Sequence, residues 1–97
     1  MDTTSIGYGA MAASEIARVE LTLGLQLKDL NGRVAAGRND VETDRLLKRC
    51  RETADSLLIA VEALGQGTKA NVLRVIADHL LLRLGMLERD YGPVRLH

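Results

Sequence analysis

The chain has 97 residues, the length of one small domain, and it contains no Trp, no Phe and only two Tyr. Its core must therefore be aliphatic, and a core this thin often gains apolar surface from a second copy of the chain. Thirteen basic and thirteen acidic side chains give a net charge of zero, so no global basic field draws in nucleic acid or an acidic membrane.

The cysteine content and the N-terminal sequence bear on the compartment. Cys50 is the single cysteine, which excludes an internal disulfide framework and fits a reducing environment. The first nine residues lack the basic start and apolar stretch of a secretory signal. No run of about 18 uncharged apolar residues occurs that would cross a bilayer. We therefore expect a cytoplasmic protein that does not enter a membrane.

Glycines divide the chain into three segments with helical periodicity. Residues 1–9 are rich in Thr, Ser and Gly, which predicts a flexible N-terminal arm. Residues 10–97 are expected to form a single helical domain, with short connections at the glycines. The predicted fold class is all-α, a three-helix up-down-up chain that assembles into a homo-oligomeric bundle, with helices at about 10–31, 40–64 and 69–91.

The first segment is ambiguous at residues 18–28. There the sequence alternates apolar and polar side chains, as a half-buried strand does. A helix also fits, because apolar residues recur at spacings of three and four, and strong helix formers precede the stretch. A lone strand would have no partner elsewhere in the chain. We therefore favour a helix whose buried stripe is Ile16, Val19, Leu23, Leu27, Leu30 and Val34.

The second segment has the clearest helical pattern. Asn39 is predicted as its N-cap, with Glu42 three residues later as in a capping box, and Gly65 as its end. Its predicted buried stripe is Leu46, Leu47, Cys50, Ala54, Leu57, Leu58, Val61 and Leu64.

The third segment carries more apolar surface than a three-helix monomer needs. Thr68 is predicted as its cap, and Gly92-Pro93 as its end. One stripe is Leu73, Ile76, Leu80, Leu84, Leu87 and Tyr91. Surplus apolar side chains away from the buried stripes predict a self-associating bundle. The expected oligomer interface is Val75, His79, Leu82 and Met86 in this segment, with Leu21 and Leu25 in the first as the second candidate surface.

One basic cluster stands out against the balanced charge. It consists of Arg33, Arg38, Arg45, Lys48 and Arg49. Doubled across a dimer, it would offer a patch for phosphates or nucleic acid. Acidic residues interleave with it, and no aromatic lies nearby to stack on bases, so a solvated face is the favoured interpretation.

No catalytic, metal or cofactor site is expected. Arg74 and His79 have a spacing that resembles the Arg-x4-His pair of a class of helical ribonucleases, where the two residues bind phosphate and transfer protons across a dimer. On a helix, however, they lie about 140° apart, and an Arg74–Asp78 ion pair beside an interface His79 is the simpler interpretation. Cys50 is expected to be a buried thiol, and one cysteine with two histidines does not make a zinc site.

Three functional classes can be considered from these observations. The favoured expectation is a small helical protein–protein interaction module of the adaptor, chaperone, anti-activator or inhibitor type. It would bind itself, as a homodimer or larger assembly, and another protein. The alternative is a nucleic-acid-binding regulator that uses the basic cluster. Helical ribonuclease chemistry at Arg74 and His79 is the third and least favoured, so we expect no enzyme.

Overall fold

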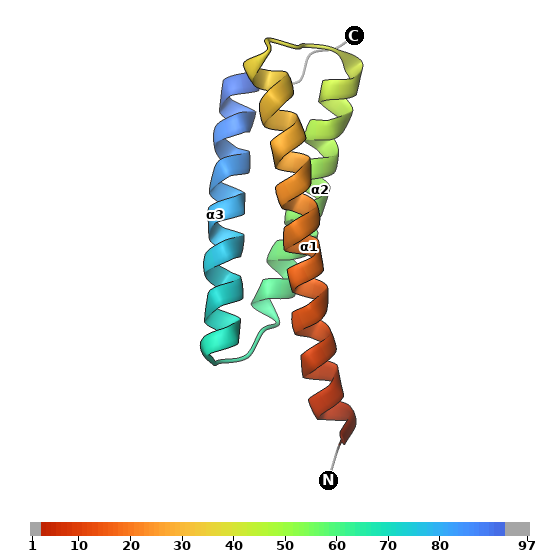
Figure 1. Cartoon of the computed structure of the whole chain (residues 1–97), viewed down its shortest axis with the longest axis vertical. Coiled ribbons are helices and arrows are strands. Elements are labelled where there is room, and N and C mark those ends of the chain that lie inside the picture. The colour runs from red at the N-terminus through yellow and green to blue at the C-terminus, as the bar shows by residue number, and fades with distance from the viewer. Residues whose placement is uncertain (1–2, 93–97) are drawn as a thin grey trace.

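The structure, a computed structural model, describes the backbone of residues 3–92 and the side chains of residues 13–92. It contains three helices, α1 (Thr3–Ala35), α2 (Val41–Glu62) and α3 (Thr68–Tyr91), and no strand within the described part of the chain. Figure 1 shows α1 and α3 running in one direction, with α2 running the opposite way behind α1. The prediction of an all-α chain with three helices is therefore confirmed.

The ambiguous stretch at residues 18–28 is helical throughout. Strong helix formers before it extend the helix into it, and its apolar residues then fall on both sides of α1. Leu23 and Leu27 are buried, whereas Leu21 and Leu25 are exposed. The alternation thus reflects a helix with two apolar faces, and the strand alternative is excluded.

Both ends of α1 lie beyond their predicted positions. The segment predicted as a flexible arm is helical from Thr3 onward, because the alanine-rich stretch that follows favours helix and extending a helix is easier than starting one. Residues 1–2 lie outside the described part. At the other end, Gly32 lies within the helix, and Gly37, with φ of 72°, ends it. The Gly37 amide donates to Val34 and the Arg38 amide to Arg33, both at 3.0 Å, which is a Schellman motif.

The N-cap of α2 is Asp40 and not Asn39, so that prediction was wrong by one residue. Asp40 Oδ1 accepts hydrogen bonds from the backbone amide of Thr43 at 2.8 Å and from its hydroxyl at 2.6 Å. These bonds, and a smaller contribution from Arg38, hold the pKa of Asp40 well below its usual range. Thr43 is fully buried, so the side chain that fixes Asp40 is itself held by the core.

The connection between α2 and α3 also departs from prediction. The second helix ends at Glu62 with Ala63 as its C-cap, before Gly65. Thr68 is the first residue of α3 rather than its cap, since Gly67, with φ of 138°, takes the cap position and offers no side-chain oxygen. The predicted stop at Gly92 is correct, with its amide donating to Glu88 O at 3.1 Å.

The core is a single cluster in which each helix contributes residues at alternating spacings of three and four. This pattern points one stripe of each helix at the other two. Two predicted core residues lie outside it: Leu58 is 46% and Ile76 is 41% exposed. In α3 the leucines fix the buried face, and Ala77 falls at its centre, four residues after Leu73 and three before Leu80. The fully buried large side chains are Ile16, Leu23, Leu27, Leu30, Thr43, Cys50, Leu57 and Leu84.

Polar contacts fix the position of α3 against α2. Arg51 binds Glu88 through two hydrogen bonds, one of them between Nε and Oε2 at 3.1 Å. The hydroxyl of Tyr91 donates to Asp44 at the start of α2. These contacts join the end of α3 to the beginning of α2. Among the described residues, no helix has the length and apolar character needed to cross a bilayer.

Candidate interaction surface

The side of α3 that faces away from the bundle carries a second apolar stripe. We call Val72, Val75, His79, Leu82 and Met86 the α3 outer stripe. Its residues recur at spacings of 3, 4, 3 and 4 and follow the buried stripe with an offset of two residues. Two residues turn a helix by about 200°, so the two stripes face nearly opposite directions.

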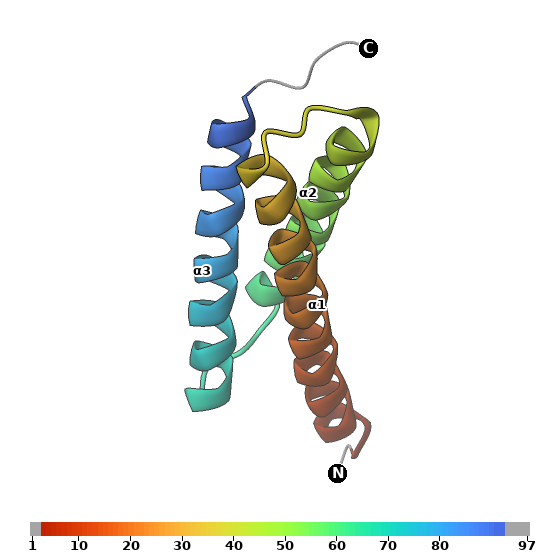
Figure 2. The same ribbon diagram turned by 45° about the horizontal axis from the view of Figure 1, so that its top comes forward.

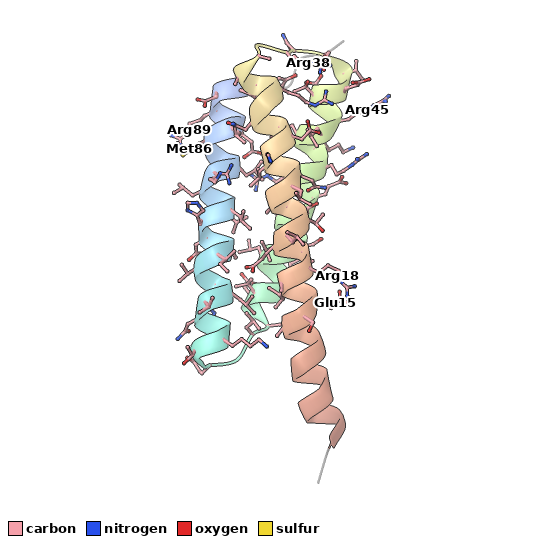
Figure 3. All side chains as sticks on the ribbon, in the orientation of Figure 1. Glu15, Arg18, Arg38, Arg45, Met86 and Arg89 are labelled. Carbon is pink, nitrogen blue, oxygen red and sulfur yellow. The ribbon has the colours of Figure 1, made fainter. Side chains whose placement is uncertain are left out.

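All five residues of the α3 outer stripe are exposed. Val75 is 67%, Leu82 60% and Met86 52% exposed. Figure 3 shows Met86 pointing away from the other two helices, and α3 lies at one side of the bundle in both ribbon views (Figures 1 and 2). Val72, which was not among the residues predicted for this surface, is 52% exposed and lies three residues before Val75. Within the part of the chain whose side chains are described, no packing accounts for this set of large apolar side chains on one helix face.

The second predicted surface, on α1, lies beside the first. A Cβ atom built on Gly24 would lie 4.0 Å from Leu80 Cδ2, which places this part of α1 against α3. Leu21 and Ile76 each lie one turn earlier on these two helices, which run in the same direction, so they stand at about the same level. Leu21 is 66% exposed. The apolar surface of α3 thus extends through Ile76 toward α1, with Leu25, 62% exposed, further round that helix.

The predicted basic cluster is divided by ion pairs. Arg33 Nε lies 3.2 Å from Asp29 Oδ1, and its Nη1 lies 3.6 Å from Glu42 Oε2. Arg38 lies 2.9 Å from Asp40 and 3.7 Å from Glu42. The carboxylates raise the pKa of Arg33, mainly through its hydrogen bond to Asp29. Two of the five predicted cations are therefore largely neutralised within the chain.

The remaining three cations, Arg45, Lys48 and Arg49, lie on the exposed face of α2. None of them forms an ion pair with another described residue. Figure 3 shows Arg45 and Arg38 at the same end of the bundle. A depression of about 230 Å³ between α1 and α2 is lined by three arginines, Arg33, Arg45 and Arg49, and by the carboxylates of Asp29 and Glu42. Its mixed charge makes it a poor site for phosphate.

Arg74 has a structural role that sequence analysis did not predict. Its guanidinium donates to the carbonyl oxygens of Leu64 at 2.8 Å and Gly65 at 2.9 Å, and to Asn71 Oδ1 at 3.2 Å. The expected pairing with Asp78 is therefore not the contact that holds it. Arginine donors near the last carbonyls of a helix stabilise its C-terminal end. The guanidinium is thus engaged at the α2–α3 connection, while His79 belongs to the α3 outer stripe.

Cys50 is fully buried as a free thiol, as predicted. Burial raises its pKa to about 11, so the reactive thiolate is scarce at neutral pH. Among the residues that the structure describes, no group of three His, Cys, Asp or Glu side chains is arranged to hold a metal ion.

The most unusual polar residue in the core is Glu20. It lies on the buried stripe of α1, four residues after Ile16 and three before Leu23, and is only 6% exposed. Its Oε2 has no hydrogen-bond partner within the described part of the chain, and burial raises its pKa. The spacing alone marks the position as buried, but an acidic side chain gives no hydrophobic signal in the sequence.

Comparison of the chain with protein families, with curated proteins and with solved structures found no match.

Proposed function

We propose that this chain is a protein–protein interaction module that acts as a homo-oligomer through the α3 outer stripe. The observation that carries the proposal is the exposed heptad pattern of this stripe, since apolar residues at spacings of three and four form the seam between packed helices. Contiguous exposed apolar surface of this kind is typical of association sites. The module belongs to the adaptor, chaperone, anti-activator or inhibitor type and works in the cytoplasm.

Leu21 and Leu25 provide the second surface, on which another protein binds. They lie on α1, separated from the α3 outer stripe by Ile76, and remain partly accessible when α3 is covered. This arrangement gives the module one face for a second copy and another for a different partner.

The test compares two apolar-to-charged substitutions on exposed positions. Leu82→Glu changes the middle of the α3 outer stripe, and Ile59→Glu changes a side chain on α2 that is 70% exposed. Neither substitution disturbs the core, so both variants keep the helical circular dichroism of the wild type. At ~100 μM, where a small interface of micromolar affinity is occupied, light scattering gives a dimer or larger mass for the wild type and Ile59→Glu. Leu82→Glu gives a monomer, and a monomeric wild type at this concentration refutes the proposal.

Nucleic-acid binding is the second candidate, supported by three exposed cations on α2 that form no ion pair with another described residue. Binding to generic duplex DNA would weaken steeply with salt, with a slope of about −3 per protomer if Arg45, Lys48 and Arg49 each neutralise one phosphate. Arg45→Glu combined with Arg49→Glu would abolish it. Absence of binding at low salt removes this candidate and leaves the interaction module intact.

A further inference from the structure

We propose that a second copy of this chain covers the α3 outer stripe. The two α3 helices pair antiparallel, with this stripe as the seam between them. This inference rests on the proposed function and adds to it the orientation and the register of the two helices. The residues at the ends of the stripe, the charges along its edges and one glycine support this arrangement.

The residues at the two ends of the stripe favour antiparallel pairing. Continuing the same spacing adds Thr68 before Val72 and Arg89 after Met86. Figure 3 shows Arg89 on the same outward side as Met86. In a parallel pair each seam residue meets its own copy, so Arg89 would face the partner's Arg89. An antiparallel pair avoids this repulsion, because it places Arg89 against the partner's Val72.

In an antiparallel pair, each layer of the seam consists of one residue from each helix, and the two residues come from opposite ends of the stripe. With the two-fold axis between His79 and Leu82, Met86 packs on the partner's Val75, and Leu82 packs on the partner's His79. All apolar members of the stripe then lie in layers with the other protomer. Moving the register by one heptad places Met86 on the partner's Thr68 and removes Arg89 from the seam.

Charges along the edges of the stripe select between these two registers. Lys69, Arg83 and Asp90 lie along one edge, together with Ile76. In the first register, with the two-fold axis between His79 and Leu82, Lys69 meets the partner's Asp90. The two-fold symmetry repeats this pair of opposite charges. In the shifted register Lys69 meets the partner's Arg83. Opposite charges at the edge of a helix pair specify partner and orientation in this way.

The other edge carries Asp78 and Gly85, and it agrees with the same register. Gly85 lies inside α3, where glycine is unfavourable, and a Cβ atom there would meet nothing within 4 Å. Packing among the described residues therefore gives no reason for a glycine at this position. In the first register Gly85 faces the partner's Asp78 and leaves room beside this carboxylate. In the shifted register Asp78 faces the partner's Asp78.

A parallel pair has one edge contact in its favour, between Asp78 and the partner's Arg83. This contact is exposed, and exposed ion pairs contribute little. Two arginines facing each other in the seam are partly desolvated, and the repulsion there is the larger effect. The balance favours the antiparallel pair.

Disulfide trapping distinguishes the orientations. Met86 and the partner's Val75 share a layer only in the proposed register, at a separation that suits a disulfide. Val75→Cys combined with Met86→Cys should therefore give covalent dimers under oxidised glutathione, whereas each single variant should not. In this antiparallel register the two copies of residue 86 lie about 16 Å apart along the axis, the length of about 11 helical residues. Cysteines at that separation cannot form a disulfide, so Met86→Cys alone should not be trapped. Wild-type chain is the control for Cys50, whose thiol is buried.

Each outcome decides the question. Covalent dimers from the double variant alone support the proposal. Covalent dimers from the single variants show a parallel pair and overturn it. A dimeric wild type whose double variant is not trapped overturns the register while leaving the proposed function standing. A monomeric wild type at ~100 μM removes both.

Charge exchange provides an independent measurement. Lys69→Glu or Asp90→Lys replaces two attractive edge pairs by two repulsive ones, so each single variant should dissociate about tenfold more readily at ~20 mM salt, where screening is weak. Lys69→Glu combined with Asp90→Lys should restore the wild-type dissociation constant. Failure of the double exchange to restore it refutes the proposed edge contact.

Discussion

Glu20 provides the sharpest test of how the core determines stability. Glu20 is 6% exposed, lies on the buried stripe of α1 and has no hydrogen-bond partner for its Oε2 among the described residues. An unsatisfied buried polar group destabilises the folded state by about 1–3 kcal/mol. Leucine has a similar volume and no polar atoms, so Glu20→Leu should remove this penalty. We expect the free energy of unfolding at pH 7 to rise by about 1–3 kcal/mol. Each kcal/mol should raise the Tm by roughly 4–8 °C.

The pH dependence of this effect has a defined sign. Burial raises the pKa of Glu20 above its ordinary value of 4.5, so the folded state binds a proton more tightly than the unfolded state does. Below pH 4.5 the carboxyl is protonated in both states, and the wild type retains the associated stability. This stability is lost as the pH rises through the pKa of the folded state. The advantage of Glu20→Leu should therefore be smallest near pH 4 and largest near pH 7.

Urea denaturation at both pH values measures the difference. It is best carried out in the Leu82→Glu background, where association does not add to the apparent stability. Glu20→Gln, which keeps the shape and removes the charge, should abolish the pH dependence attributed to this carboxyl. A Glu20→Leu variant that is less stable than the wild type at pH 7 would refute the reasoning, because it would show that the carboxylate has a favourable partner.

Three further substitutions test the helix ends and the α3 surface. In the Leu82→Glu background, where no partner lies against residue 85, Gly85→Ala should stabilise the chain by about 0.5–1 kcal/mol, seen as a higher Tm, because a Cβ atom there meets open space within a helix. Asp40→Ala should lower the Tm more than Asn39→Ala does, since Asp40 is the residue that caps α2. Because the pKa of Asp40 is lowered in the folded state, this difference in Tm should be full above pH 3.8 and should shrink as the pH falls through the folded pKa. Arg74→Ala should reduce the free energy of unfolding in urea by about 1–2 kcal/mol, since its charged donors hold two carbonyl groups. An unchanged midpoint of urea denaturation would show that water replaces the guanidinium donors.

The helices could be predicted from the sequence because their buried stripes repeat over many turns. Leu73, Leu80, Leu84 and Leu87 fix the face of α3 even though Ile76 was assigned to it wrongly. Neighbouring apolar residues on a helix lie about 100° apart, so the pattern does not say which of two is buried. Ala77 is the buried one because it lies at the centre of the leucine stripe, and alanine gives only a weak hydrophobic signal.

The helix ends and the polar contacts could be predicted less well. Asn39 and Asp40 are both good capping residues, and the choice between them depends on the position of Thr43, which the core fixes. The pairing of Arg33 with Glu42 requires the turn after α1 to bring two helix ends together. Such contacts depend on tertiary structure and leave no periodic pattern in the sequence.

The two stripes of α3 connect the stability of the chain with its proposed association. Its inner stripe consists mainly of leucine and alanine and is buried against α1 and α2. With no large aromatic in the core, this burial supports a small domain of modest stability. The α3 outer stripe places further apolar side chains, Val72, Val75, Leu82 and Met86, on the opposite side of the same helix. A second copy covering them would add to the burial that holds α3 in place. Because a partner that binds only the folded chain stabilises it by mass action, folding and association of this protein should be coupled through α3.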